Sequence, residues 1–226
     1  MFGSRKNAYG KTSNELIRSR EYDIFSLGDY NIREYDNPEG LLVDNHKSLG
    51  PVSDWVKRWS KIVPSGGEVL DVACGSGRHS FYFAGLGHSV CAVDKRSDLI
   101  ASFDKHPNIV FSVCDLESGF WPFTGRTFDC VVVTNYLHRA LFPLLISSLS
   151  SQGVLIYETF MLGNELFGKP GNPDFLLMPN ELIDYFAKEL TVIAFEAGLV
   201  EQPRRATIQR ICAVAGGYSH PGKIEI

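Results

Sequence analysis

The sequence predicts an α/β protein built on a mostly parallel β-sheet with helices on both of its faces. Between residues 69 and 158, short apolar runs typical of buried strands take turns with helical patterns, and this alternation is typical of parallel sheets covered by helices. The first apolar run ends in a glycine turn, Cys74-Gly75-Ser76-Gly77, which leads directly into a helical pattern. Polar residues follow the ends of several runs, where such sheets bind their ligands.

The individual elements are expected in the following order. Apolar residues at helical spacing predict helix on either side of Gly50-Pro51, within residues 41–62. Apolar and β-branched runs predict strands at 69–73, 89–93, 109–113, 128–134 and 153–157. Helical patterns predict one helix that stops at Gly85 and Gly87, and others at 97–105, at 139–149 and from near Pro179.

The glycine turn and the carboxylate after the next strand indicate a nucleoside ligand. Gly75 and Gly77 carry no Cβ, so the turn can take positive φ and a ligand can approach the backbone closely. The following apolar run ends in Asp94, about twenty residues later, a spacing at which a carboxylate reaches the hydroxyls of a ribose. The alternative is a strand, turn and helix without a ligand.

The residues around the turn argue against a dinucleotide. Such a site requires a third glycine where this chain has Ser80. Asp71 lies four residues before Gly75, and its charge would repel a pyrophosphate but would suit the ammonium group of an amino acid.

The pattern Asp71-Val-Ala-Cys-Gly75-Ser-Gly77 resembles the first motif of class I S-adenosylmethionine-dependent methyltransferases, with Ala73 where the family has its first glycine. The resemblance implies S-adenosyl-L-methionine as cofactor. It also implies a Rossmann-like, seven-stranded, mostly parallel sheet with a reversed C-terminal strand, and residues 190–196 and 207–213 fit the last strand pair.

The same resemblance implies which residues bind the cofactor. In the family an acidic residue after the third strand meets the adenine amino group and the next backbone unit meets the ring, and Asp115 and Leu116 match these positions. Residues 135–138, after the fourth strand, are expected to touch the methionine end and the methyl acceptor, and they differ from the N-P-P-Y quartet of DNA and protein amide methylases. The complete expected set is Asp71, Ala73, Cys74, Gly75, Gly77, Asp94, Lys95, Asp115, Leu116 and Asn135.

Further segments extend the resemblance to a largely uncharacterised group of methyltransferases that is similar over the core to the tellurite-resistance type. They lie at 135–139, 157–160, 163–165 and 172–175. The expected organisation is an N-terminal tail and wrap at 1–40, a methyltransferase domain at 41–215, and a C-terminal tail at 216–226.

The segment 159–178 is expected to be a lid, because loops of this length inside a compact domain usually cover or bind ligands. Phe160, Phe167 and Phe175 could line a pocket there. A loop that lies on the surface is the alternative.

Three residues are candidates for catalysis: His138, Tyr136 and Glu158. A thiolate or metalloid acceptor needs no base, whereas an oxygen or amine acceptor must lose a proton, for which the ordinary pKa of histidine is suited. The alternatives are that His138 only packs or forms hydrogen bonds, and that Glu158 forms an ion pair with Arg139 or Arg210. Arg78 and His79 are expected to face solvent or the N-terminal segment.

Composition narrows the class of protein. The 226 residues carry a net charge of −4, but the first twenty have five basic residues and one acidic residue, so they contribute +4 and leave −8 for the rest. The basic segment is interpreted as disordered or docking, with a cleaved targeting segment or an RNA-binding arm as alternatives. No apolar run approaches the ~20 residues of a membrane span. The five cysteines form no C-x-x-C and indicate free thiols in a reducing compartment. A cytoplasmic protein without a metal is therefore expected, and its oligomeric state is not indicated.

These observations favour a methyltransferase that acts on a small molecule. An RNA or protein methyltransferase is the first alternative, supported by the basic tail and opposed by the acidic remainder. An NAD-linked oxidoreductase and a non-catalytic nucleoside-binding module are alternatives of another class.

Overall fold

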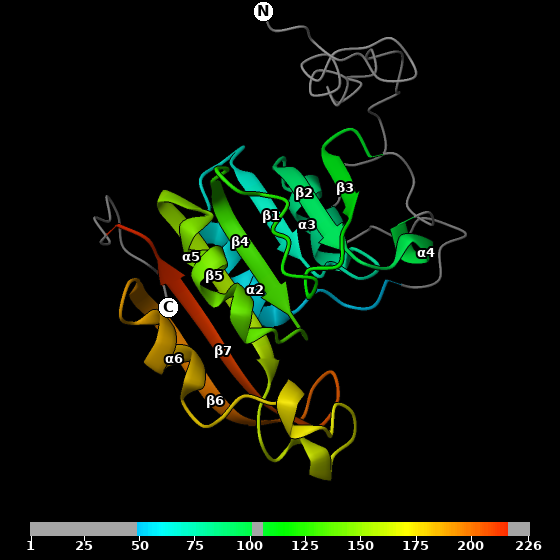
Figure 1. Cartoon of the computed structure of the whole chain (residues 1–226), viewed down its shortest axis with the longest axis vertical. Coiled ribbons are helices and arrows are strands. Elements are labelled where there is room, and N and C mark those ends of the chain that lie inside the picture. The colour runs from blue at the N-terminus through cyan, green and yellow to red at the C-terminus, as the bar shows by residue number, and fades with distance from the viewer. Residues whose placement is uncertain (1–48, 101–105, 217–226) are drawn as a thin grey trace, which may run out of the picture. The chain divides into compact units, whose positions relative to one another are not determined.

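The computed structural model describes residues 49–100 and 106–216 (Figure 1). The predicted tail and wrap at 1–40, the first part of the 41–62 helical region, the end of the 97–105 helix and residues 217–226 lie outside the described residues. The strands form one seven-stranded sheet in the order β3-β2-β1-β4-β5-β7-β6. Their bounds are β1 Glu68–Val72, β2 Ser89–Asp94, β3 Ile109–Val113, β4 Phe128–Thr134, β5 Leu149–Phe160, β6 Thr191–Val200 and β7 Ala206–Val214.

The pairing confirms the predicted fold class. The first five strands pair in parallel, whereas β7 runs antiparallel to both β5 and β6. The chain order reverses between β1 and β4, and sheets of this kind bind ligands at that point, beyond the carboxyl ends of the strands. We call the side on which β1 to β5 end the carboxyl edge.

Helices cover both faces of the sheet, as predicted. They are α2 Asp54–Trp59, α3 Arg78–Gly85, α4 Ser97–Ile100, α5 Phe142–Ser147 and α6 Glu181–Phe186, with short 3-10 turns η2 Ser60–Ile62, η3 Arg139–Leu141, η4 Asn164–Leu166 and η5 Pro173–Phe175. Trp55 of α2 and Phe83 of α3 share one buried cluster, and Phe142 of α5 and Phe186 of α6 share the other. Alternate strand residues supply the two clusters because successive side chains point to opposite faces.

The fifth strand is longer than its apolar run predicted. The predicted helix at 139–149 ends at Ser147, and β5 begins at Leu149, which pairs with Phe128. The polar residues before Gly153 belong to β5, and Ser150 Oγ donates to Asp129 Oδ1 at 3.1 Å. A Cβ on Gly153 would lie 2.8 Å from the Phe128 carbonyl oxygen. Glycine is therefore required where the strand bends against β4.

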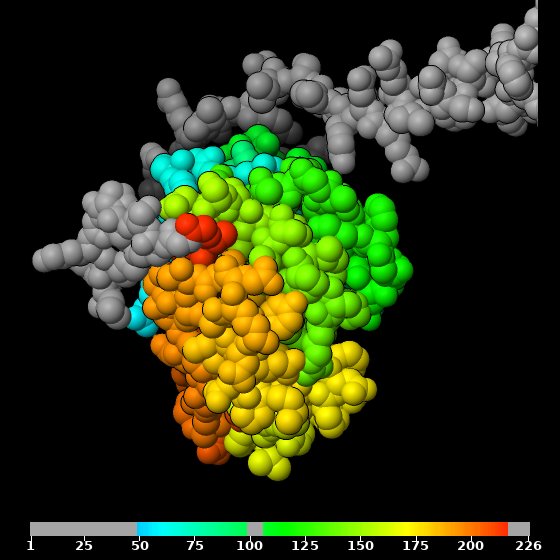
Figure 2. Space-filling model, turned by 60° about the vertical axis from the view of Figure 1, so that its left-hand side comes forward, coloured from blue at the N-terminus to red at the C-terminus, as the bar shows by residue number. Residues whose placement is uncertain are grey.

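The segment 159–178, expected to be a lid, is paired at its base. Thr159 and Phe160 belong to β5, and Leu177 N donates to the Phe160 carbonyl at 3.0 Å. Phe160 and Leu176 form a separate buried cluster with Ala206 and Ile208 of β7. The segment extends beyond the carboxyl end of β5 (Figure 1), and its surface is continuous with that of α6 and β6 (Figure 2, yellow and orange). Phe167 and Phe175 are 37% and 50% exposed.

Candidate functional site

The glycine turn after β1 has the backbone geometry that the sequence predicted. Gly75 and Gly77 have φ values of 54° and 79°, and Ala73 also has a positive φ of 53°. Positive φ is costly for alanine. Ala73 nevertheless adopts it where the family has a glycine, so the turn is retained. Gly77 N donates to the Cys74 carbonyl at 2.9 Å, which closes the turn against α3.

Asp94 is bonded to this turn. Its Oδ2 accepts from Gly75 N and its Oδ1 from Arg96 N, both at 2.9 Å. A carboxylate has about four acceptor positions, so each oxygen retains capacity for a ligand hydroxyl. The next residue, Lys95, is exposed and its Nζ lies 3.7 Å from Glu117 Oε1.

Asp71 lies beneath the turn and is closed to solvent. It is 1% exposed and accepts from Ser80 Oγ at 2.6 Å. Burial raises the pKa of its carboxyl group to about 7, although hydrogen bonding to Ser80 and the charge of Arg78 oppose the rise. The serine that replaces the third glycine of a dinucleotide motif therefore holds this carboxyl group in place.

Asp115, Leu116 and Tyr136 meet at the same edge. Asp115 Oδ1 accepts from Glu117 N at 3.0 Å, and Leu116 is 5% exposed, which anchors the backbone after β3. Burial raises the pKa of the Tyr136 phenol, and Glu117, Asp115 and Asp94 raise it further. Acidic residues at the end of β2 and after β3 thus lie close enough to this hydroxyl group after β4 to raise its pKa.

The loop after β4 is held by hydrogen bonds to residues of β5. Asn135, in the left-handed region with φ 55°, donates its N–H to the Glu158 carbonyl at 2.9 Å. The Tyr157 hydroxyl donates to the Tyr136 carbonyl at 2.9 Å. His138 is partly buried, and its carbonyl accepts from Leu141 N at 3.0 Å. These bonds hold three of the predicted site residues in one short segment.

Glu158 is engaged by neighbours on two sides. Ser53 Oγ donates to its Oε1 at 2.9 Å, and Arg210 Nη1 donates to its Oε2 at 3.3 Å. Arg210 lies directly opposite Glu158 in the β5–β7 register. Of the two ion-pair partners considered from the sequence, Arg210 is therefore correct, whereas Arg139 pairs with Glu181 at 2.6 Å.

His79 does not face solvent, contrary to one of the two expectations from the sequence. The other expectation, contact with the N-terminal segment, involves residues outside the described part of the chain. His79 is 2% exposed, because the first turn of α3 points it between α2 and β4. Ser53 N donates to Nε2 at 3.2 Å, so Nδ1 carries the ring proton and donates to Thr134 Oγ1 at 3.2 Å. Burial, and then Arg78, lower its pKa to about 3.

Ser53 was not recognised from the sequence as part of this edge. It caps α2 by accepting from Trp55 N and Val56 N while it bonds His79 and Glu158. A serine before an acidic helical start is a cap signal, but its contacts with α3 and β5 depend on the tertiary fold.

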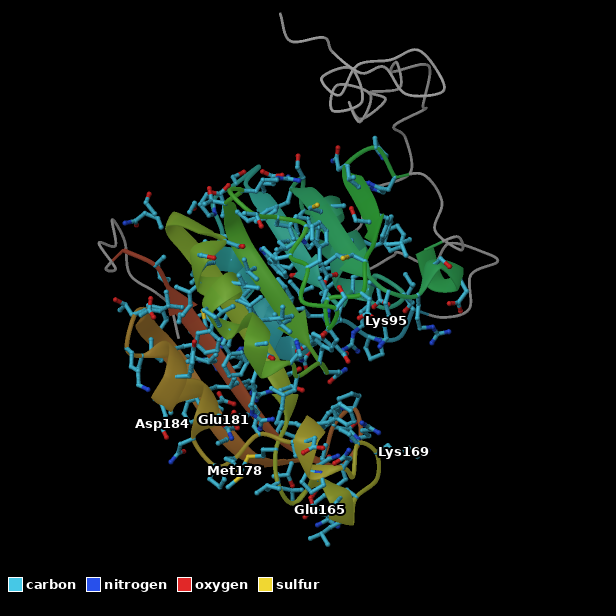
Figure 3. The ribbon with its side chains drawn as sticks, in the orientation of Figure 1. Lys95, Glu165, Lys169, Met178, Glu181 and Asp184 are labelled. Carbon is cyan, nitrogen blue, oxygen red and sulfur yellow. The ribbon has the colours of Figure 1, made fainter. Side chains whose placement is uncertain are left out.

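A hollow of about 290 Å³ lies elsewhere, beside α6. Its lining residues are Arg139, Met178, Pro179, Glu181, Asp184, Tyr185 and Lys188. Figure 3 shows Glu181 and Asp184 on α6 and Met178 just before it, whereas Lys95 lies on the loop after β2. None of the expected cofactor-binding residues lines this hollow.

The described part of the chain shows further features relevant to the site's chemistry. All five cysteines are free thiols, and four of them are buried. Among the described residues no group of histidine, cysteine and carboxylate side chains is arranged to hold a metal ion. In the same part of the chain, no helix has both the length and the apolar content needed to cross a bilayer.

Comparisons with known proteins agree with the geometry. Residues 69–148 match a family model described as a methyltransferase domain. YqeM of Bacillus subtilis (strain 168), which is named as a methyltransferase, is 25% identical over 128 residues, and these are 52% of each chain. The match therefore spans about half the length of this curated relative.

Solved structures share the fold. TehB from Haemophilus influenzae is similar with a TM-score of 0.62 and 20% identity over 74% of this chain and 63% of that chain. A TehB-like methyltransferase from Corynebacterium glutamicum has a TM-score of 0.54 and 16% identity over 74% and 90% of the two chains. The glycopeptide N-methyltransferase MtfA, in complex with S-adenosyl-L-methionine, has a TM-score of 0.54 and 19% identity over 72% and 93%. Residues 69–148 therefore match a methyltransferase domain, and the strand order 3-2-1-4-5-7-6 gives the chain the Rossmann-like fold of class I methyltransferases.

Proposed function

We propose that the protein transfers the methyl group of S-adenosyl-L-methionine to a small-molecule acceptor. The observation that carries the proposal is the 2.9 Å hydrogen bond between Gly75 N and Asp94 Oδ2. It joins the glycine turn after β1 to the ribose-binding candidate at the end of β2, and β1 is one of the two strands between which the strand order reverses. A nucleoside bound there would lie along the carboxyl edge.

The proposed contacts follow the edge. Asp94 would accept from the ribose hydroxyl groups, and Asp115 with the Leu116 backbone would bind adenine. The turn from Ala73 to Gly77, which includes Cys74, would approach the sulfonium end. Asn135 would face the methionine moiety. Lys95, paired with Glu117, would flank the ribose. Asp71 is buried, so its proposed role is to brace the turn through Ser80 rather than to touch the cofactor.

The reaction is an in-line displacement. A lone pair of the acceptor forms a bond to the methyl carbon while the carbon–sulfur bond breaks, and its electron pair stays on sulfur, which leaves as the neutral thioether of S-adenosylhomocysteine. The chain's main contributions to such a step are alignment and the exclusion of water.

An oxygen or amine acceptor also loses a proton, and we propose His138 as its receiver. Tyr136 is less suited because its raised pKa keeps the phenol protonated at neutral pH, so it would position the acceptor as a hydrogen-bond donor. Glu158 is bonded to Ser53 and Arg210, which supports a positioning role for its carboxylate.

The acceptor class is supported by charge and by one structural relative. Outside the first twenty residues the chain is acidic, with a net charge of −8, which does not favour a polyanionic RNA substrate. MtfA is by its name a glycopeptide N-methyltransferase, so this fold also serves acceptors smaller than proteins or nucleic acids.

Transfer of a radiolabelled methyl group from S-adenosyl-L-methionine to separate pools of small metabolites, RNA and protein tests the proposal. We expect label in the small-molecule pool with the full chain. Label confined to RNA or protein would overturn the acceptor class, and no label in any pool would count against methyl transfer itself.

A further inference from the structure

Arg139 fastens the loop after β4 to two later parts of the chain. It directly follows His138 and is the first residue of η3. Its Nε and Nη2 donate to Glu181 Oε1 and Oε2 at 2.6 and 2.9 Å, which makes a bidentate pair. Its Nη1 donates to the Asp174 carbonyl at 3.0 Å, and its Nη2 donates to the Leu176 carbonyl at 2.9 Å. Most of the N–H donors of this side chain are therefore engaged.

The groups that Arg139 binds are themselves held in place. Glu181 Oε2 also accepts from Met178 N at 2.8 Å, just before α6 (Figure 3). Gln209 of β7 is fully buried; its side chain accepts from Leu182 N at 3.2 Å and donates to the Met178 carbonyl. Burial acts to raise the pKa of Glu181, but the hydrogen bonds from Arg139 and from Met178 N outweigh burial, and the pKa is lowered. Arg139 thus ties the loop to a well-anchored part of the fold.

His138 lies between two points at which this loop is held. Its backbone is extended, with φ −139° and ψ 102°. Before it, the Tyr157 hydroxyl donates to the Tyr136 carbonyl at 2.9 Å, and after it comes Arg139 with its bonds to later elements. Among the described residues, none forms a hydrogen bond with the imidazole of His138. The direction of the ring is therefore set by the backbone on either side of it.

We propose that Arg139 is a positioning residue, which orients the imidazole of His138 toward the methyl acceptor. It would act through its bonds to Glu181 and to the two carbonyl groups, without contact with the acceptor or the cofactor. A displacement of about 1 Å in a reacting group can slow a reaction by about 100-fold. The inference rests on the proposed function, because it concerns the residue proposed to receive the proton.

Arg126 provides a matched control at the opposite end of β4. It lies two residues before the strand and pairs with Glu68, the first residue of β1. The side chains of Arg126 and Arg139 are 44% and 42% exposed. Removal of either arginine breaks one ion pair between two elements, but only Arg139 adjoins the proposed proton acceptor.

The test is a double-mutant cycle on the full chain. Transfer of label from S-adenosyl-L-methionine to the small-metabolite pool is measured for wild type, Arg139→Met, His138→Ala and the double variant. Arg139→Lys and Arg126→Met are measured beside them. Urea denaturation reports the stability of each variant, and calorimetry with S-adenosylhomocysteine reports its affinity for the cofactor product.

We expect Arg139→Met to lower turnover by about 10-fold or more. In the His138→Ala background the same substitution should cause no further loss, because residues that act as a unit have non-additive effects. Affinity for S-adenosylhomocysteine should stay within about 2-fold. Arg139→Lys keeps the charge without the planar fork and should recover part of the turnover. Arg126→Met should lower the urea midpoint as Arg139→Met does, but retain wild-type turnover.

NMR measures the placement of the ring without an acceptor. The Hε1 resonance of His138 is assigned by its absence in His138→Ala. We expect one sharp resonance at the same position in wild type and Arg126→Met, and a shifted or broadened resonance in Arg139→Met. If Arg139→Met does not fold, Glu181→Gln takes its place, since it weakens the bidentate pair and leaves both carbonyl bonds.

Three results would overturn the inference: full turnover of Arg139→Met, additive losses in the cycle, or a His138 resonance that Arg139→Met leaves unchanged. Full turnover of His138→Ala would overturn it together with the proton-acceptor assignment. Absence of methyl transfer by wild type contradicts the proposed function instead, and the NMR comparison then decides whether Arg139 positions His138.

Discussion

Asp71 and Asp94 show how burial gives two aspartates of adjacent strands different roles. Asp71 is 1% exposed and bonded to Ser80, whereas Asp94 is partly exposed and accepts from the Gly75 N–H of the turn. Both positions were found from the sequence by their spacing from the glycines. The burial of Asp71 was not, because it depends on Ser80 returning over β1 in the first turn of α3.

The buried carboxyl group of Asp71 predicts a pH dependence of stability. In the folded protein its pKa is about 7, against 3.8 for an unperturbed aspartate. Between these values the unfolded chain binds fewer protons, so this residue's contribution to the free energy of unfolding falls as pH rises from about 4 to about 7, and is constant above that.

Asp71→Asn removes this contribution. We expect the free energy of unfolding of this variant, measured by urea denaturation, to change less than that of wild type over the same pH interval. The difference between the two changes should be on the order of a few kcal/mol. Asp98→Asn, an exposed aspartate paired with Arg96, is the control and should follow wild type. Parallel curves for wild type and Asp71→Asn would show that Asp71 ionises normally in the fold.

His138→Ala tests the proposed proton acceptor. If the acceptor atom must lose a proton, turnover should fall by about 100-fold or more, while calorimetric affinity for S-adenosylhomocysteine stays within about 2-fold. His106→Ala is the control, since His106 precedes β3 at its amino end. Unchanged methyl transfer by His138→Ala would remove this residue from the chemistry.

At the level of elements, the sequence predicted the strands better than the segments that connect them. The runs at 109–113 and 128–134 became β3 and β4 with the predicted bounds. The β-branched residues of both runs favour strands, although β4 is mostly buried whereas β3 lies at the sheet edge with Val110 and Val113 exposed. The bend at Gly153 and the base of the 159–178 segment were not predictable, because each depends on pairing with a distant strand, β4 or β7.

Ser53 joins three elements, and its removal should destabilise the protein. Its hydroxyl group caps α2 and donates to Glu158 of β5, while its N–H donates to His79 of α3. We expect Ser53→Ala to lower the free energy of unfolding by about 1–2 kcal/mol, measured by urea denaturation. Ser147→Ala, which removes an exposed hydroxyl group near the end of α5, should change it by less than about 0.5 kcal/mol. Equal effects of the two substitutions would mean that the Ser53 contacts are not important for stability.

For the molecule as a whole, topology explains why residues far apart in the chain form one site. Parallel strands that share a direction all end on one side, so the residues after β1, β2, β3 and β4 gather at the carboxyl edge (Figure 1). This gathering was predictable from alternation alone. The burial of His79 was not, because the sequence does not indicate which residues of α3 face α2.

The central claim is that this edge recognises a sulfonium nucleoside rather than a dinucleotide. Calorimetric titration of the full wild-type chain with S-adenosylhomocysteine and, separately, with NAD tests it most directly. The arrangement of Asp94 with the glycine turn, and of Ser80 with Asp71, predicts saturable binding of S-adenosylhomocysteine and no measurable heat with NAD. Binding of NAD without a response to S-adenosylhomocysteine would contradict the account.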